Sequence, residues 1–184
     1  MVGVVALWFP YILLNAIFPG PVPTYLLGVL LALLGIALAT LGEVPPSRGY
    51  LQWARASRQG IVCCIGQLCL LLLVLALGRG ASWDWREALV FAPLSALGQE
   101  LYFRSALLGV LEGVFLRSAK TAVLLQALLF SIWHLRAFQV TTVPIALAIL
   151  MAAFIAGCLW GWQVQKDRTV LYVTAQHALF LIVL

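Results

Sequence analysis

Four ionisable side chains lie inside long apolar stretches of this 184-residue chain, and they are the residues that could do chemistry. Glu100 and Arg104 lie in an apolar run that extends from about Ala88 to Val110. His134 and His177 lie in two later runs, and they are the only histidines of the chain. A spacing of four residues places Glu100 and Arg104 on one face of a helix, where they can pair.

One carboxylate and two imidazoles are sufficient, in principle, to hydrolyse a peptide bond without a covalent intermediate. A carboxylate and a histidine on facing helices can activate a water molecule. A second imidazole can donate a hydrogen bond to the oxyanion that forms when this water attacks an amide. The alternative is structural: an ion pair that fixes helix packing, together with buried packing histidines.

Metal and serine chemistry are less well supported by the residues available. The chain contains no HExxH motif, and using both histidines and Glu100 as zinc ligands would leave no separate base, so we expect no metal and no other cofactor. Ser95, Ser105 and Ser131 lie near these residues, but none has a GxSxG context.

The composition places these residues in a membrane. The chain is 64% hydrophobic and 9% charged, whereas soluble domains carry about 25% charged residues. A helix needs roughly 20 apolar residues to cross about 30 Å of hydrocarbon. We therefore expect one membrane-embedded domain over residues 1–184, an all-α polytopic bundle with about seven spans (six to eight). The predicted partners are membrane lipid and a membrane-associated peptide or protein, and no nucleic-acid motif is present.

The apolar runs predict where these spans lie. They extend over about Val2–Phe18, Thr24–Leu41, Ile61–Leu77, Ala88–Val110, Thr121–Phe138, Pro144–Trp162 and Val170–Leu184. The first run is expected to be a span rather than a signal peptide, because no basic residues precede it. Prolines predict a tight turn at Pro19–Pro23, and arginines among aromatic residues predict a basic interfacial segment, or else a solvated loop, at Glu43–Gln59. Trp160 and Trp162, at the end of the sixth run, are expected in an aromatic belt at the membrane interface.

The basic residues and the cysteines complete this outline. With seven spans, one side of the membrane holds seven basic residues and the other holds three, Arg79, Arg86 and Arg136. The positive-inside rule then predicts a cytoplasmic N-terminus.

The cysteines lie in apolar runs and are expected to be small packing residues, namely Cys63, Cys64, Cys69 and Cys158.

At its ionisable residues the sequence resembles the CPBP family of intramembrane glutamic endopeptidases, which includes the CAAX prenyl-protein endopeptidases. The family motifs EExxxR, FxxxH and HxxxN correspond, in this order, to Gln99–Arg104, Phe130–His134 and His177–Leu181. The resemblance covers roughly Ala88 to the C-terminus, which is the motif-bearing part, 88–184.

The resemblance implies a role for each motif residue. It implies that His134 activates water, that His177 donates to the oxyanion, and that Arg104 orients the pair Gln99 and Glu100. Two positions depart from the family pattern: Gln99 replaces the first glutamate, and Leu181 replaces the asparagine. A neutral amide cannot act as a general base.

Three explanations stay open for Gln99. The first is that Glu100 has taken over as the base, although a neighbouring helical residue points about 100° away. The second is that the chain is a natural non-catalytic homologue. The third is that the glutamine was introduced to silence the enzyme.

The leading hypothesis is an intramembrane glutamic-type endopeptidase that cuts near a lipidated or hydrophobic C-terminal segment. The resemblance alone supplies this substrate. One alternative is a non-catalytic membrane scaffold or peptide-binding protein. Another is a proton-coupled transporter, which could use the same buried residues but would be expected to show an inverted repeat that is not evident. The small size and the absence of targeting signals suggest the bacterial inner (plasma) membrane.

Overall fold

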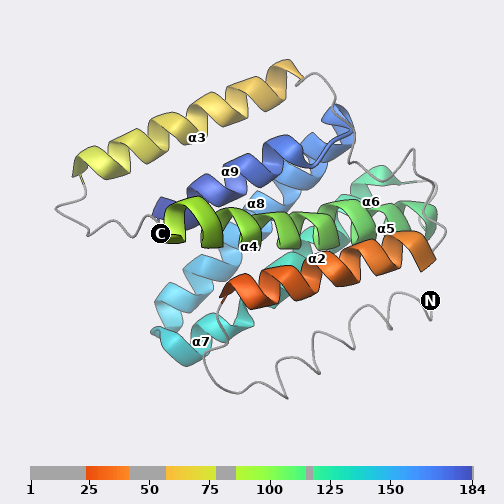
Figure 1. The fold of residues 1–184 in the computed structure, drawn as a ribbon, viewed down its shortest axis with the longest axis horizontal. Coiled ribbons are helices and arrows are strands. Elements are labelled where there is room, and N and C mark those ends of the chain that lie inside the picture. The colour runs from red at the N-terminus through yellow and green to blue at the C-terminus, as the bar shows by residue number, and fades with distance from the viewer. Residues whose placement is uncertain (1–23, 42–56, 78–85, 115–117, 184) are drawn as a thin grey trace.

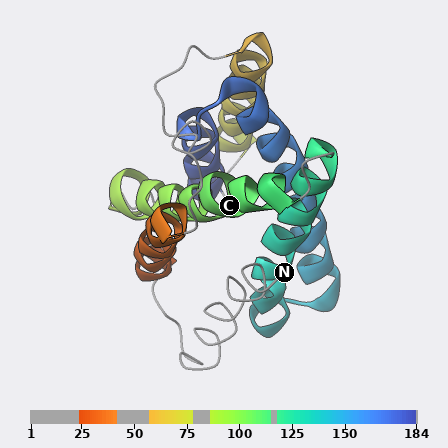
Figure 2. The same cartoon turned by 90° about the vertical axis from the view of Figure 1, so that its right-hand side faces the viewer.

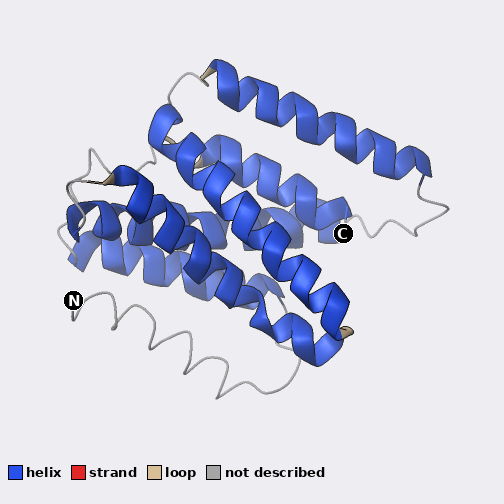
Figure 3. Cartoon of the chain, turned by 180° about the vertical axis from the view of Figure 1, so that it is seen from behind, coloured by secondary structure: helices blue, strands red, loops and turns tan. Residues whose placement is uncertain are grey.

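The protein is seen in a computed structural model that describes residues 24–41, 57–77, 86–114 and 118–183. Within these ranges the chain forms helices and no β-strand (Figure 3), so the helical fold class is confirmed for them. Three predictions lie outside the described residues: the first span, the turn at Pro19–Pro23, and nearly all of the interfacial segment Glu43–Gln59.

The first two described helices, α2 (Thr24–Leu41) and α3 (Arg58–Leu77), coincide with the second and third predicted spans. Helix α3 begins three residues before the predicted Ile61 because Ser57 caps it: the Ser57 hydroxyl accepts a hydrogen bond from the Gly60 amide at 3.0 Å. The Ser57 amide donates in turn to Asp167 Oδ1 at 2.9 Å. This cap ties the start of α3 to the end of a distant helix.

The fourth predicted span is a continuous helical rod at the centre of the molecule. It consists of the π-helical segment η2 (Glu87–Phe91), α4 (Ala92–Glu100), a second π-helical segment η3 (Leu101–Leu107), and α5 (Leu108–Val114). All seven residues of η3 are buried. A π-helical segment widens the helical turn and is frequent at functional sites. Here it lies directly after Glu100 and contains Arg104.

The remaining elements form two long helical segments and a short final helix. Helix α6 (Ala119–Trp133) continues through a 3₁₀ turn, η4 (His134–Arg136), into α7 (Ala137–Val140). Helix α8 (Val143–Asp167) runs five residues past the predicted end at Trp162, and it stops where Arg168 adopts a left-handed conformation with φ 57°. Helix α9 (Leu171–Val183) follows.

Two of the described helical segments are long and apolar enough to cross a membrane. They are Ala119–Val140, with 22 residues, and Val143–Asp167, with 25 residues, and they correspond to the fifth and sixth predicted spans. The apolar part of α9, Leu171–Ile182, is shorter than the roughly 20 residues that a perpendicular span needs. The total of about seven spans stays a prediction.

The central rod packs between helices from both ends of the sequence. Helix α4 contacts α2 and α9, and α6 contacts α8. In Figures 1 and 2, α2 and α3 lie on opposite sides of the rod. Small residues allow the closest approach: a Cβ atom added to Gly28 of α2 would lie 2.7 Å from Ser95 Cα. Close backbone contact of this kind is typical of membrane helices.

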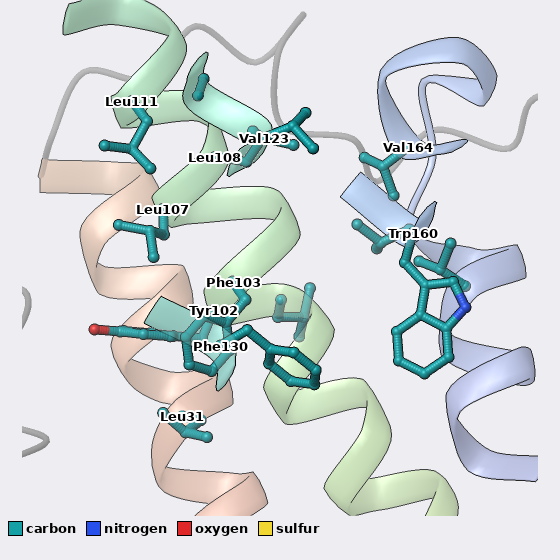
Figure 4. Packing of buried hydrophobic residues seen from close by; sticks show 14 of the residues in the cluster. Leu31, Tyr102, Phe103, Leu107, Leu108, Leu111, Val123, Phe130, Trp160 and Val164 are labelled. Atoms are coloured by element: carbon teal, nitrogen blue, oxygen red, sulfur yellow. The ribbon is translucent and has the colours of Figure 1, made fainter. Parts of the chain in front are cut away.

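The apolar core lies where the rod meets α6 and α8. Figure 4 shows Phe103 and Phe130 beside one another, with Trp160 directed toward them from α8. The rings of Phe103 and Phe130 pack edge to face with centroids 5.2 Å apart, and Phe130 and Trp160 are 6.4 Å apart. This aromatic group forms one wall of the candidate site.

Candidate active site

Glu100 connects two of the predicted site residues through one carboxylate oxygen. Its Oε1 atom lies 3.0 Å from Arg104 Nη1 and 2.8 Å from His177 Nδ1. Glu100 is the last residue of α4, Arg104 lies one turn later in η3, and His177 lies on α9. Elements far apart in the sequence therefore meet at this carboxylate.

This group is almost completely buried. Glu100 and Arg104 are both 0% exposed, and His177 is 2% exposed. An isolated buried charge is very unfavourable, so such charges occur paired. The aromatic core adds a further contact for the cation, because Arg104 Cζ lies 3.9 Å from the centroid of the Phe130 ring.

His134 lies at the point where α6 tightens into the 3₁₀ turn. Its backbone N–H reaches the Ser131 carbonyl, three residues back, so the Phe130 carbonyl is left for another donor. His134 Nδ1 takes this place at 2.9 Å. The imidazole also packs edge to face on the Phe130 ring, with centroids 4.9 Å apart. Phe130, the first residue of the FxxxH motif, thus positions its own histidine.

A cavity of about 380 Å³ brings the two histidines to one space, and the rest of its lining is apolar. Helix α8 supplies one wall, while α6, η4 and α9 supply the other. Leu181 lines this cavity one turn after His177, at the position of the family asparagine. Glu100 and Gln99 are not lining residues, so the carboxylate is linked to the cavity through His177.

Gln99 stands apart from the group that the other motif residues form. Its amide nitrogen donates to Ser95 Oγ on the same helix at 3.2 Å, and its Oε1 is buried with no hydrogen-bond partner. Arg104 pairs with Glu100, and among the described residues no hydrogen bond joins Arg104 to Gln99. The implied orienting role of Arg104 therefore has a geometric basis for Glu100 alone.

The sequence did not indicate that Trp160 belongs to the site, yet this residue contacts His177 directly. Its indole stacks on the His177 imidazole, with centroids 4.8 Å apart and planes 32° apart. Trp160 is 4% exposed, so its predicted position in an aromatic belt at the membrane surface is wrong. Trp162, two residues later, is 40% exposed. A spacing of four places Trp160 on the same helix face as Ala156 and Ala152, and that face lines the cavity.

The described residues also bear on the metal and cysteine predictions. Among them, no group of three or more histidine, cysteine, aspartate or glutamate side chains could hold a metal ion. Cys64, Cys69 and Cys158 are free thiols. The side chain of Cys63 lies outside the described part.

Comparison with known proteins identifies the family of the chain. A family model described as type II CAAX prenyl endopeptidase, Rce1-like, matches residues 81–183. No curated protein and no solved structure matches the chain. The matched segment contains all three motifs and more than half of the sequence. The family resemblance is thereby confirmed, and the chain belongs to the Rce1-like family of type II CAAX prenyl endopeptidases, which are integral membrane proteases.

Proposed function

We propose that this chain is an active intramembrane endopeptidase in which Glu100 orients an imidazole that activates water. The observation that carries the proposal is the contact of 2.8 Å between Glu100 Oε1 and His177 Nδ1, beside a cavity that both histidines line. The substrate would be a membrane-associated peptide or protein, cut near a lipidated or hydrophobic C-terminal segment.

The position of Glu100 favours an indirect role for its carboxylate. Its Oε1 atom already accepts from two donors, and the residue is 0% exposed. When His177 Nδ1–H donates to this carboxylate, the free lone pair of the neutral imidazole is on Nε2. A carboxylate that orients a histidine base in this way is the arrangement of a catalytic triad. His177 then takes the proton of the attacking water and returns it to the leaving amine.

The second imidazole is fixed in the same tautomer. A carbonyl oxygen can only accept, so His134 Nδ1 must donate to Phe130, which leaves Nε2 of His134 as a second acceptor. One water molecule could donate to both imidazoles. This keeps the water-activating role that the resemblance implies for His134, and it makes His177 the base rather than the oxyanion donor.

Cleavage of membrane-anchored peptides by the purified protein tests this proposal. We expect His177→Ala to lower kcat by about 10²-fold or more, which is the usual contribution of a general base, and Glu100→Gln to lower it by a smaller factor. Cys69→Ser is the control, because this thiol is exposed and does not line the cavity. Equal turnover in the parent chain and in His177→Ala would overturn the proposed mechanism.

A non-catalytic peptide-binding protein is the second candidate, and Gln99 favours it. The glutamine replaces a family glutamate, and its amide is bound to Ser95 rather than directed to the cavity. This candidate predicts that anchored peptides bind without turnover, even after Gln99→Glu. Measuring binding and cleavage on the same peptide separates the two functions.

A further inference from the structure

We propose that Trp160 is a positioning residue that holds the His177 imidazole with Nε2 directed into the cavity. The inference rests on the proposed function of His177 as the base. Trp160 lies on α8, outside the three family motifs, and it reaches the reaction only through the histidine.

Three contacts from three elements fix the His177 ring. Glu100 Oε1 holds Nδ1 at 2.8 Å, which sets the rotation of the ring within its plane. Trp160 stacks at a centroid distance of 4.8 Å with a tilt of 32°, and Phe130 meets the ring edge to face at 5.8 Å and 87°. The terminal torsion of histidine is broad, so the hydrogen bond alone would leave the plane free to turn about it.

Trp160 is itself held on several sides. Its ring lies 5.4 Å from Arg104 Cζ and 6.4 Å from the Phe180 ring. The indole N–H lies 3.3 Å from the amide of Gln67 on α3, which accepts from Trp160 Nε1 when the amide oxygen is turned toward the indole. In that orientation Gln67 also donates to the backbone carbonyl of Gln176 at 3.2 Å. Gln67 thereby links Trp160 to the residue that precedes His177.

Two other roles would make different predictions for the same tryptophan. Trp160 lines the cavity, so it could contact substrate, and its loss would then raise KM. It also belongs to the buried core, so it could serve only to fill space. A positioning role predicts a fall in kcat with little change in KM, and it predicts that a smaller aromatic ring preserves much of the effect.

The experiment compares Trp160→Leu, which removes the stacking ring, with Trp160→Phe, which keeps a ring but lacks the N–H. We expect kcat to fall at least 10-fold in Trp160→Leu, and less than 3-fold in Trp160→Phe. Trp162→Leu is the matched control, because this neighbouring tryptophan is exposed and contacts Lys166 instead. A rise in KM without a fall in kcat, or equal losses in the Leu and Phe variants, would overturn the proposal.

A second readout does not depend on catalysis. The chain has only two histidines, so nitrogen-labelled histidine gives two pairs of ring-nitrogen signals, one pair for each imidazole, and His134→Gln assigns them. We expect a protected Nδ1–H signal for His177 in the parent chain and in Trp160→Phe, and its loss by exchange in Trp160→Leu. An unchanged His177 signal in Trp160→Leu would refute positioning. If the His177 signal changes as expected but neither the parent chain nor any variant cleaves peptide, the proposed function fails. The inference that Trp160 positions the His177 imidazole is then still supported.

Discussion

At the scale of single residues, the energetics of the site depend on one carboxylate that is completely buried. Glu100 and Arg104 are each 0% exposed and pair at 3.0 Å. Even on the most lenient insertion scales, a charge at the centre of a membrane helix costs about 3 kcal/mol. The pair therefore exists because each charge compensates the other, and removal of one partner leaves the second uncompensated.

Pairing of this kind predicts strongly non-additive mutations. We expect Arg104→Met to destabilise the protein by about 3–5 kcal/mol, the usual effect of breaking a buried pair. We expect Glu100→Gln combined with Arg104→Met to be less destabilising than Arg104→Met alone. Thermal unfolding in detergent measures the two single variants, Glu100→Gln and Arg104→Met, and the double variant. Additive losses would show that the two charges do not depend on each other.

Leu181 provides the second prediction at this scale. It lines the cavity one turn after His177, so the wall carries an apolar side chain where the family pattern has an amide. Removing one oxyanion donor from an enzyme typically lowers kcat by about 10²–10³-fold. We therefore expect Leu181→Asn to raise kcat by about 10-fold or more. Leu181→Ala, which removes the same side chain without adding a donor, is the control and should not raise it.

At the scale of elements, apolar runs predicted where the described helices lie, but not where they end. The end of α8 depends on Arg168, whose left-handed conformation has no apolar signature. The start of α3 depends on Asp167, a residue 110 positions away along the chain from Ser57. Local hydropathy carries no information on the backbone conformation of Arg168 or on the contact between Ser57 and Asp167.

The contacts of the candidate site were likewise only partly predictable from the sequence. The pairing of Glu100 with Arg104 follows from a helical spacing of four and was predictable. The contact between Glu100 and His177 joins residues 77 positions apart, and the sequence predicted only that a carboxylate and two imidazoles share one site. The stacking of Trp160 on His177 depends on the packing of α8 against α9, which no local pattern in the sequence predicts. The π-helical turn of η3 also lacks a sequence signal.

Helix packing beside the site leads to a prediction for Gly98, the residue before Gln99. A Cβ atom at this position would overlap the backbone carbonyl of Gly28 on α2, and neither backbone can move without shifting a helix. We expect Gly98→Ala to destabilise the protein by about 1–3 kcal/mol or more, as overpacking does. Gly113→Ala is the control, because nothing lies within 4 Å of a Cβ atom there and alanine favours a helix. Thermal unfolding that ranks Gly113→Ala below Gly98→Ala would contradict this packing.

At the scale of the whole molecule, the cavity opens at the surface of the helix bundle. Ile145 and Phe180, both lining residues, are 52% and 36% exposed. Helices α6 and α8 belong to the two described segments that are long and apolar enough to span a membrane, so we expect this opening to face the bilayer. An apolar segment could then enter from the bilayer without crossing water. The seven-span count and the cytoplasmic N-terminus stay predictions.

The size of the apolar group that enters would be set by small residues on α8. The cavity wall on α8 carries an alanine at every fourth residue, namely Ala148, Ala152 and Ala156. These residues share one helix face, and their short side chains leave space in the cavity. We expect Ala152→Phe to raise KM about 10-fold for peptides with a long apolar anchor, and to affect short anchors little, because the added ring occupies the space that only a long anchor reaches. Ala175→Phe on the exposed face of α9 is the control, since Ala175 does not line the cavity. Cleavage of a series of anchors of increasing length measures the effect, and an equal rise in KM at every length would mean that the α8 wall does not select for size.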